Sequence, residues 1–571
     1  MRSDPEHSRR PHLAIAGLTT LSVLVVLRPW NAADSVPRNL GDPVFVTWVL
    51  TWVSGTLAST PLDVFDAPIF WPRGDTLAYS DPLLGLAPVY GALHALTGSW
   101  TWSVGLLASG LVAATMVATF GLARFLTGRT DAALLAAVAM GLSDLVLAQW
   151  GHIQLQVMAA VPVGMWLLML TLRRPSRAVT VGLGMIGGGL LVTTASVGLA
   201  WAVAATAMLA GHLVLAPSTV TRRVLTHLVA VGVLTAAIAL PVAVPYLRLQ
   251  GDPAFTRPLE PLASFEVGDL LRPTRERAVL GGLQLGPRRP ADVLDPPTRE
   301  RELHPGLIAL LLAPVGLVVV IRGGRRPPGD EDAEAWWRVH GTRLVVAAGA
   351  TAALVAAGPD LLGPLSPYRV LHEHVPGFSG LRVASRFALV TVLAVAVLAA
   401  AGWAAIAARM GRRPATVALA AILIAVSWID LAIPVRWAEL PTDGVTLAPY
   451  RALASGGARG PVVELPMAPV DERWDTTEAP RQLYATIDGR PRVNGFSGFV
   501  PPGYVETIEL ANRFPAPESV AHLRHLGVST VVLHVDDLPA GVPASAARRV
   551  GDAWVIDLSG PRSTWPGGGG G

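Results

Sequence analysis

Long apolar segments alternate with short polar segments along most of this chain. Each approaches the roughly 20 residues that an α-helix needs to cross a bilayer, and a helix satisfies its own backbone hydrogen bonds, which lipid cannot do. The segments lie at residues 12–29, 102–124, 132–150, 154–172, 178–195, 197–215, 224–246, 305–321, 343–359, 386–407 and 416–434. The pattern predicts a mostly α-helical, polytopic membrane protein with about eleven transmembrane helices.

The first apolar segment resembles a signal peptide in length. It has no small-residue cleavage site, and Arg28, Pro29 and Trp30 follow it directly. We therefore interpret it as a retained membrane anchor.

Basic residues predict the orientation of the chain. Arginines precede the first apolar segment and then cluster in every second short loop, at Arg124 and Arg129, Arg173 to Arg177, Arg222 and Arg223, Arg322 to Arg326, and Arg409 to Arg413. Basic loops stay in the cytoplasm. We therefore expect a multi-pass protein of the plasma (inner) membrane with a cytoplasmic N-terminus and, because the number of spans is odd, an extracytoplasmic C-terminus.

Three predicted external stretches are longer than plain connectors, at residues 30–101, 247–304 and 360–385. The first contains two amphipathic runs, Phe45–Leu57 and Leu83–Leu96. Such runs are typical of helices that lie flat on a membrane surface. Residues 1–434 thus form a predicted transmembrane domain with long external loops.

The chain changes character after Pro434. Strand-like runs at 462–465, 529–534 and 553–558 alternate with a helical stretch at 517–526, a pattern typical of a small α/β domain. We assign residues 435–562 to an extracytoplasmic α/β domain and residues 563–571 to a disordered, glycine-rich tail. The glycines and aromatic residues of Gly489–Phe499 predict a loop, which either faces the membrane part or is an ordinary surface loop.

Composition narrows the class of protein further. Apolar residues make up 51% of the chain and charged residues 15%, which a soluble protein of this length would not show. Cysteine is absent, which excludes disulfides, thiolate metal sites and a cysteine nucleophile. The net charge of +4 is no sign of nucleic-acid binding, because the arginines flank apolar segments.

Two aspartates of the first external stretch are candidate catalytic residues. Asp42 and Asp81 are each followed by proline, so each could simply cap a helix that begins there. Carboxylates close to a membrane are costly to desolvate and often mark function. The two interpretations are compatible, because a capping carboxylate keeps an oxygen free.

The second external turn contains His152 and Gln154. A histidine beside an amide could ligate a divalent cation or bind phosphate. A lone histidine at the start of a helix is more often structural, and both interpretations stay open.

Arg382 and Arg386 precede the tenth apolar segment at a spacing of i, i+4. On a continuous helix they would share one face. Arginine binds phosphate oxygens through two parallel hydrogen bonds, so the pair predicts a site for a lipid-linked phosphate or pyrophosphate. The alternative is that both side chains anchor to lipid headgroups.

Several segments together resemble bacterial membrane proteins of the C-type glycosyltransferase (GT-C) superfamily. The resemblance rests on Gly-Asp-Pro at 41–43, Ile69-Phe-Trp-Pro, Leu77-Ala-Tyr-Ser-Asp, Gly151-His-Ile-Gln, the run from His374 to Phe387, Val462-Val-Glu-Leu-Pro, Gly489 to Phe499 and Gly527 to His534. It covers nearly the whole chain.

The resemblance implies a transferase that takes its sugar from a polyprenyl-phosphate carrier, with an active site on the outer face. Asp42 matches the position of the family's catalytic carboxylate. Many members hold a metal with a second acidic pair, where this chain has His152 and Gln154. A divalent metal, magnesium or manganese, is therefore an open expectation, with His152 as its candidate ligand.

The favoured hypothesis is inverting transfer of a sugar to a hydroxyl of an extracytoplasmic glycan or lipid. Asp42, or else Asp81, would act as general base, while Arg382 and Arg386 would neutralise the leaving phosphate. No nucleotide-binding motif is present in the sequence. The alternatives are a transporter or flippase of lipid-linked sugars, with Asp144, His212 and Asp430 as its ionisable residues, and a non-enzymatic assembly protein.

Overall fold

The computed structural model describes residues 5–274, 299–323, 333–411, 413–457, 459–471 and 474–560. Their contacts divide the chain into two compact units. Unit 1 consists of Met1–Pro29, Ala108–Val242 and Thr256–Val435. Unit 2 consists of Trp30–Leu107, Ala243–Phe255 and Arg436–Gly571. The predicted tail at 563–571 and parts of the predicted loop 247–304 lie outside the described residues.

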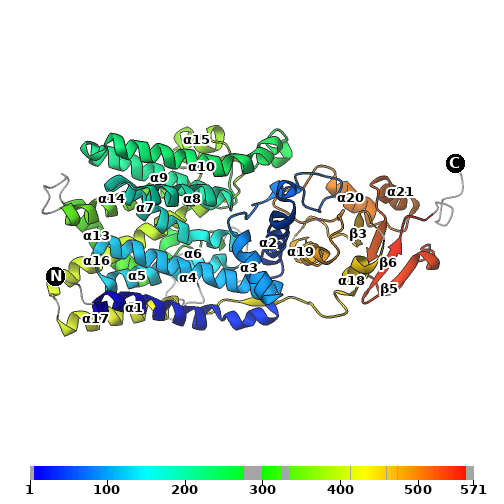
Figure 1. Cartoon of the computed structure of the whole chain (residues 1–571), viewed down its shortest axis with the longest axis horizontal. Helices are drawn as coiled ribbons and strands as arrows, with labels where there is room; N and C mark the ends of the chain where they lie inside the picture. Colours follow the sequence, from blue (N-terminus) through cyan, green and yellow to red (C-terminus); the bar gives the residue numbers. More distant parts are fainter. Residues whose placement is uncertain are drawn as a thin grey trace. The chain divides into compact units, whose positions relative to one another are not determined.

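Unit 1 is built from helices in its described part (Figure 1). They are α1 (Pro5–Ser22, continued by a π-helix at Val23–Leu27), most of α4 (Trp100–Thr127), α5 (Thr130–Gly141), α6 (Asp144–Ala148), α7 (Ala160–Arg173), α8 (Arg177–Leu191), α9 (Ala195–Leu215), most of α10 (Arg222–Leu249), α11 (Val267–Leu271), α13 (Leu307–Arg322), α14 (Ala333–Ala356), α15 (Pro367–His374), α16 (Ala388–Met410) and α17 (Pro414–Leu431). Short 3₁₀ segments at Ile153–Ala159 and Ala384–Phe387 precede α7 and α16.

Eight helical segments in the described part of the chain are long and apolar enough to cross a membrane. They cover Trp100–Thr127, Thr130–Gly151, Ile153–Arg173, Ala195–Leu215, Arg222–Leu249, Ala333–Ala356, Ala384–Met410 and Pro414–Leu431. Three shorter apolar helices, Pro11–Leu27, Arg177–Leu191 and Leu307–Arg322, lie where the other three spans were predicted. The protein is therefore a multi-pass membrane protein, and the count of eleven spans stays a prediction.

The third predicted span, 132–150, lies within Thr130–Gly151, a helical segment long and apolar enough to cross a membrane, but its helix is interrupted. The α-helix stops at Gly141 and a new one starts at Asp144. Ser143 causes the break, because its hydroxyl donates to the Met140 carbonyl (2.8 Å) and accepts from the Val146 N–H (3.4 Å) as an N-cap. Gln149, which follows the second helix, donates to Glu300 (3.1 Å) in the candidate site described below.

Helices α13 and α16 pack backbone against backbone. A Cβ added to Gly316 of α13 would overlap the Leu398 carbonyl oxygen of α16, and one added to Gly402 of α16 would overlap the Leu312 carbonyl oxygen. Small residues permit such close approach between membrane helices, where dispersion rather than the hydrophobic effect holds the helices together. Glycine is required at both positions.

Unit 2 contains a four-stranded sheet in the order β3-β4-β6-β5 (Figure 1). The strands are β3 (Val462–Leu465), β4 (Thr530–Leu533), β5 (Ala547–Val550) and β6 (Ala553–Asp557), and the helices around them are α18 (Ala448–Ser455), α19 (Trp474–Tyr484), α20 (Tyr504–Ala511) and α21 (Pro517–His525). Strands β3 and β4 are parallel, and the other pairs are antiparallel. Every residue of β3 and β4 is buried, whereas β5 exposes two arginines on the sheet edge, which discourages pairing with another chain.

The first predicted external loop belongs to the same unit as this sheet. Strand β1 (Ser35–Pro37) pairs antiparallel with β2 (Trp437–Glu439), and helices α2 (Asp42–Ser59) and α3 (Ala87–Thr97) pack on each other. Helix α2 also packs against α19. Residues 43–50 of α2 are all buried, so the expectation of a helix lying flat on the membrane surface is wrong for this part of α2.

The segment Gly489–Phe499 is largely irregular, as predicted. Its carbonyls accept hydrogen bonds from the backbone of the first loop, Asn494 from Phe70 (3.2 Å) and Arg492 from Trp71 (2.8 Å). The predicted contact of this segment with the membrane part stays a prediction.

Candidate active site

A buried carboxylate, Glu300, is the centre of a polar cluster in unit 1. Its Oε1 accepts from the Nη2 of Arg386 (2.5 Å), and its Oε2 accepts from the Nε of Arg386 (3.1 Å) and from the Nε2 of Gln149 (3.1 Å). The Arg386 pair is bidentate, the strongest geometry for a guanidinium and a carboxylate. Glu300 is 5% exposed, so the pair is shielded from water.

Backbone contacts place Arg386 on this carboxylate. The hydroxyl of Ser385 donates to the Glu300 carbonyl (2.7 Å), and the N–H groups of Ala384 and Ser385 both point to the Ala263 carbonyl (3.1 Å each). These bonds hold the residues before α16 in a short 3₁₀ turn.

The expectation that Arg382 and Arg386 share one helix face is wrong. Val383 has extended backbone angles (φ −133°, ψ 104°), and the Arg382 carbonyl accepts from the Leu262 N–H (2.7 Å). The 3₁₀ turn begins at Ala384, so Arg382 precedes the helical residues. Both arginines nevertheless act electrostatically on Glu300.

Arg382 also acts on a third arginine, Arg257. Burial, and then the charge of Arg382, lower the pKa of Arg257 to about 10. Arg257 is half-buried and Arg382 is exposed. The charge of Arg382 thus acts on Arg257, and neighbouring guanidiniums are the groups that bind anions with several oxygens.

Glu300 is ionised within this cluster. Burial by itself raises the pKa of Glu300, but the charge and hydrogen bonds of Arg386, and then the charges of His152 and Arg382, outweigh it. The pKa is therefore held below its ordinary value. One carboxylate thus faces several cationic side chains.

His152 is joined to the cluster through Gln149. The Nδ1 of His152 lies 2.5 Å from the Oε1 of Gln149. An amide oxygen accepts hydrogen bonds, so we assign the imidazole proton to Nδ1. The chain His152–Gln149–Glu300 then fixes the orientation of all three side chains.

The described residues around His152 form no group arranged to hold a divalent metal. Both oxygens of Glu300 already accept hydrogen bonds from Arg386 and Gln149, and guanidiniums rather than further carboxylates surround it. Within the described ranges, no group of three or more His, Asp or Glu side chains is arranged to hold a metal ion. Metal binding by His152 stays a prediction.

Asp42 lies in unit 2, in the first turn of α2 with Gly41 as the N-cap residue. A second carboxylate, Asp475 in the first turn of α19, approaches it closely. A Cβ added to Gly41 would overlap the Oδ2 of Asp475. Burial raises the pKa of Asp475, the N–H of Thr476 (2.7 Å) opposes this, and the charge of Asp42 adds to it. A raised pKa makes a carboxylate a better proton acceptor.

Asp81 does not cap a helix. Helix α3 begins at Ala87 with Leu86 as its N-cap residue, so the proline after Asp81 lies in irregular chain. Asp81 acts electrostatically on Tyr246, whose hydroxyl donates to the Ser80 carbonyl (2.7 Å). These contacts are all within unit 2, where Asp81 is half-buried.

Sequence reasoning missed Glu300, Arg257 and Asp475. Glu300 stands in a run of alternating arginine and glutamate, Arg299 to Glu302, which has no distinguishing pattern. Asp475 pairs with a residue far away in the chain. Arg257 had one usable signal, because it is basic in a stretch predicted to be external, where positive charge is disfavoured.

No protein-family model matches the sequence, and no curated protein matches it significantly. Solved structures do match it. The oligosaccharyltransferase of Archaeoglobus fulgidus in its apo form matches with a TM-score of 0.50 and 12% identity, covering 91% of this chain and 69% of that chain. The mycobacterial arabinofuranosyltransferase AftD matches with a TM-score of 0.50 and 16% identity, covering 93% of this chain and 37% of that chain.

At these identities the likeness establishes the fold. The chain has the fold of the GT-C glycosyltransferases, as the sequence resemblance implied. It spans little more than a third of AftD.

Proposed function

We propose that this protein is a glycosyltransferase that moves a sugar from a polyprenyl-phosphate carrier to a hydroxyl of a glycan or lipid outside the cytoplasm. One observation supports the proposal: backbone hydrogen bonds hold Arg257 and Arg382 in adjoining segments near the Arg386–Glu300 pair. The Arg257 N–H donates to the Ser379 carbonyl (2.9 Å), and the Leu262 N–H donates to the Arg382 carbonyl (2.7 Å). Keeping like charges together lowers the stability of the fold. An anionic ligand that bridges them offsets this cost.

The donor phosphate is assigned to Arg257 and Arg382. Arg386 is held by Glu300, so its role is to position the turn rather than to bind phosphate directly. Charge develops on the phosphate oxygens as the sugar leaves, and preorganised guanidiniums stabilise it. A lipid carrier suits a cation pair within a membrane unit, because the isoprenoid chain can stay in the bilayer.

Asp42 is assigned as the general base. The acceptor oxygen attacks C1 of the sugar, the bond from C1 to the phosphate oxygen breaks, and the acceptor proton moves to the Asp42 carboxylate. Polyprenyl phosphate leaves, and the configuration at C1 inverts. Burial and the charge of Asp42 raise the pKa of Asp475, so the two carboxylates titrate as a coupled pair. Asp81 is the second candidate base of the same unit.

The test of the base is Asp42→Asn in protein reconstituted with a polyprenyl-phosphate sugar. The variant keeps the size of the side chain but removes its basicity. We expect transfer to fall by roughly 10²–10⁴-fold, the usual contribution of a general base, with an unchanged melting temperature. The control is Asp63→Asn, an exposed aspartate of the same loop, which should keep full activity.

Full activity in Asp42→Asn would exclude this base and transfer the assignment to Asp475 or Asp81. Loss of stability together with activity would instead make Asp42 a structural residue of the start of α2. A strain that lacks this protein can be compared with its parent for envelope glycans. Identical glycans in the two strains would contradict the transferase function as a whole.

The topology that supports this assignment has eleven spans, a cytoplasmic N-terminus and an external unit 2. Reporter fusions at Gly411, after α16, and at Gly489 in unit 2 should report opposite sides of the membrane. Identical readouts would contradict the topology, and with it an acceptor site outside the cytoplasm.

A transporter of lipid-linked sugars is the second candidate, because two histidines meet inside the helices of unit 1. The Nδ1 of His212 in α9 lies 2.9 Å from the Nε2 of His340 in α14, and the Nε2 of His212 lies 3.0 Å from the Thr219 hydroxyl. Paired ionisable groups within spans are typical of proton-coupled transport. His340→Gln should abolish movement of a fluorescent lipid-linked sugar across proteoliposomes if this candidate holds, and should leave glycosyl transfer intact if it does not.

Asp144, another of the ionisable residues that favoured a transporter, has a structural explanation. Its carboxylate accepts from the N–H and the hydroxyl of Thr274 (3.1 and 3.4 Å). It therefore ties the loop before residue 275 to the start of α6.

A further inference from the structure

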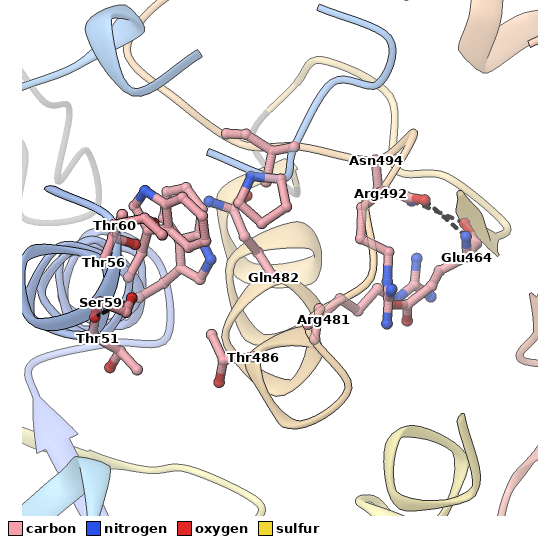
Figure 2. A pocket seen from close by; sticks show the side chains of 17 residues that line it. Thr51, Thr56, Ser59, Thr60, Glu464, Arg481, Gln482, Thr486, Arg492 and Asn494 are labelled. Atoms are coloured by element: carbon pink, nitrogen blue, oxygen red, sulfur yellow. Dashed lines mark hydrogen bonds and ion pairs between the residues drawn. The ribbon is translucent and has the colours of Figure 1, made fainter. Parts of the chain in front are cut away.

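Unit 2 contains a cavity of about 320 Å³ that the proposed reaction does not use. Helix α2 forms one wall and helix α19 the facing wall, and residues of β3 and of the segment 489–494 complete the lining (Figure 2). Pockets for small organic ligands begin at about this volume. The cavity therefore has the size for one ring rather than for a chain of rings.

The wall from α2 combines an indole with hydroxyl groups. Trp52, Gly55, Thr56 and Ser59 follow one another at the i, i+3, i+4 and i+7 spacing of a single helix face and all line the cavity. The Nε1 of Trp52 donates to the Val64 carbonyl (2.9 Å), which fixes the plane of the ring. An aromatic face of this kind packs against the C–H groups of a ligand.

The hydroxyls of this wall are available as acceptors. The hydroxyl of Thr51 donates to the Thr47 carbonyl (2.8 Å) and that of Ser59 donates to the Gly55 carbonyl (3.0 Å). Each hydroxyl has one proton and two lone pairs. Because the Thr51 proton is used inside the helix, one lone pair of its oxygen accepts from the Tyr90 hydroxyl (2.9 Å). The remaining lone pair of Thr51 and those of Ser59 suit a ligand rich in O–H donors.

The wall from α19 has a buried amide whose nitrogen has no hydrogen-bond partner among the described residues. Gln482 is 5% exposed, and its Oε1 accepts from the Phe496 N–H (2.8 Å). This bond fixes the orientation of the amide, because the flipped form would set N–H against N–H. In the part of the chain that the structure describes, the Nε2 of Gln482 then has no hydrogen-bond partner. Figure 2 shows Gln482 between the hydroxyls of α2 and the Glu464–Arg492 pair.

The charged residues at the far side of the cavity are already paired. The Nε of Arg492 donates to Glu464 (3.2 Å), and its two Nη atoms donate to Asp488 (3.0 and 2.5 Å). Glu464 also accepts from the Tyr450 hydroxyl (2.8 Å). Arg481 donates to the Pro466 carbonyl (2.7 Å). Since these charges are balanced by partners in the protein, an uncharged ligand fits better than an ion.

We propose that this cavity binds one uncharged sugar ring. A sugar ring combines an apolar C–H face for Trp52 with hydroxyls that both donate, to the oxygens of α2, and accept, from the Nε2 of Gln482. We assign this ring to the acceptor glycan, and that role rests on the proposed function. The binding of a sugar by the cavity does not depend on the proposed function.

The test measures binding to the full-length protein in detergent by saturation-transfer difference NMR. The probes are the methyl glycosides of arabinose, galactose, glucose and mannose, and the control probe is cyclohexanol, a ring of similar size with one hydroxyl. We expect saturable transfer to at least one glycoside and tenfold weaker binding of cyclohexanol, about the effect of losing two neutral hydrogen bonds.

Two variants separate sugar binding from folding. Gly55 lines the cavity, and a Cβ added to it meets no atom within 4 Å, so Gly55→Leu extends a side chain from this wall and raises the helix propensity of α2. It should abolish binding without lowering the melting temperature. Gln482→Leu should weaken binding about 3- to 10-fold, the effect of one hydrogen bond. The matched controls, Gly110→Leu on an exposed face of α4 and the exposed Gln250→Leu, should leave binding unchanged.

Failure of the proposal and failure of the proposed function are distinguishable. Glycoside binding that Gly55→Leu abolishes supports the proposal even if no transferase activity exists. Absence of binding by all four glycosides overturns it even if the wild type transfers sugar. Equal binding of cyclohexanol would make the cavity an apolar or lipid site, and full binding in Gly55→Leu would place the sugar elsewhere. Either result overturns the proposal.

Discussion

Each unit contains one cluster of arginine and carboxylate side chains, and we propose different roles for the two clusters. Among the described residues, the Glu300 cluster of unit 1 contains one carboxylate, Glu300, and the arginines Arg386, Arg382 and Arg257. In the Glu464 cluster of unit 2, Arg492 meets two carboxylates, Glu464 and Asp488, and Glu478 lies beside Arg481 (3.4 Å). The first cluster ends in an exposed guanidinium, Arg382, whereas the side chains of the second are shielded from water except at Arg481.

The difference shows when a buried ion pair becomes a binding site. A balanced network such as the Glu464 cluster satisfies its own donors and acceptors and acts as a rigid wall. A cluster with more arginines than carboxylates among its described residues, such as the Glu300 cluster, attracts anions. The two clusters should therefore respond differently to substitution, and four experiments compare them.

The largest effect is expected on stability, from Arg492→Met. Removing this arginine leaves Glu464 and Asp488 buried without their cation. Breaking a buried pair in this way costs roughly 3–5 kcal/mol of unfolding free energy. The matched change in the other cluster, Arg382→Met at an exposed side chain, should stay within about 0.5 kcal/mol. Chemical denaturation of the purified protein measures the unfolding free energy of both variants. Equal losses would contradict the proposed difference between the two clusters.

Donor binding should instead depend on the arginines of the Glu300 cluster and not on those of unit 2. Arg257→Ala with Arg382→Ala removes both guanidiniums of the proposed phosphate site and should weaken the binding of polyprenyl phosphate by about 100-fold or more, because hydrogen bonds to charged groups contribute about 1.5–3 kcal/mol each. The double control Arg451→Ala with Arg548→Ala, at exposed arginines of unit 2, should change binding by less than about twofold. Unchanged binding in the first double variant would make the pair headgroup anchors.

Acid should destabilise unit 2 through Glu464. Burial raises the pKa of Glu464, but its hydrogen bond with His534 and the charge of Arg492 outweigh burial and lower the pKa from 4.5 to about 2. A carboxylate with a depressed pKa stabilises the fold fully above its ordinary pKa, and this contribution is lost as pH falls from about 4.5 through 2. The slope is at most about 1.4 kcal/mol per pH unit for one group. Melting temperatures between pH 5 and 3 should fall in the wild type and less steeply in Glu464→Gln.

The smallest effect is expected from Arg382→Lys. Lysine keeps the charge but not the planar fork that binds two phosphate oxygens. Donor binding should weaken about 3- to 10-fold, between the wild type and Arg382→Ala, with a steeper dependence on salt if the remaining attraction is a simple point charge. Full retention of affinity would contradict bidentate binding at this residue.

The helices could be predicted from the sequence, since each of the eleven apolar segments is helical in the structure. Strands β3, β4 and β6 and helix α21 were also predicted, because their apolar positions form short, clear runs. Strand β5 was missed, since its four residues are half arginine and lie at an edge. The break at Ser143 was missed because the apolar pattern continues through it and the cap is a single hydroxyl.

The candidate sites could be predicted only in part. Arg382, His152 and Asp42 stood out by their position near apolar segments. Their partners did not, because Glu300 meets Arg386 across 86 positions of the chain, and no local pattern carries a contact at that range. The Gln482 amide is a similar case: its missing partner follows from the bond to Phe496, which exists only in the folded unit.

The glycine contact between α13 and α16 sets limits on how the Glu300 cluster can move. Two helices whose backbones touch at Gly316 and Gly402 cannot slide past each other without losing that contact. We therefore expect them to move as one rigid body. Arg386 lies in the turn that leads directly into α16, so its backbone position is fixed by this pair of helices. Glu300 and Arg257 lie on loops instead. Entry of a bulky carrier is thus expected to bend these loops about their ends, a hinge motion rather than helix shear.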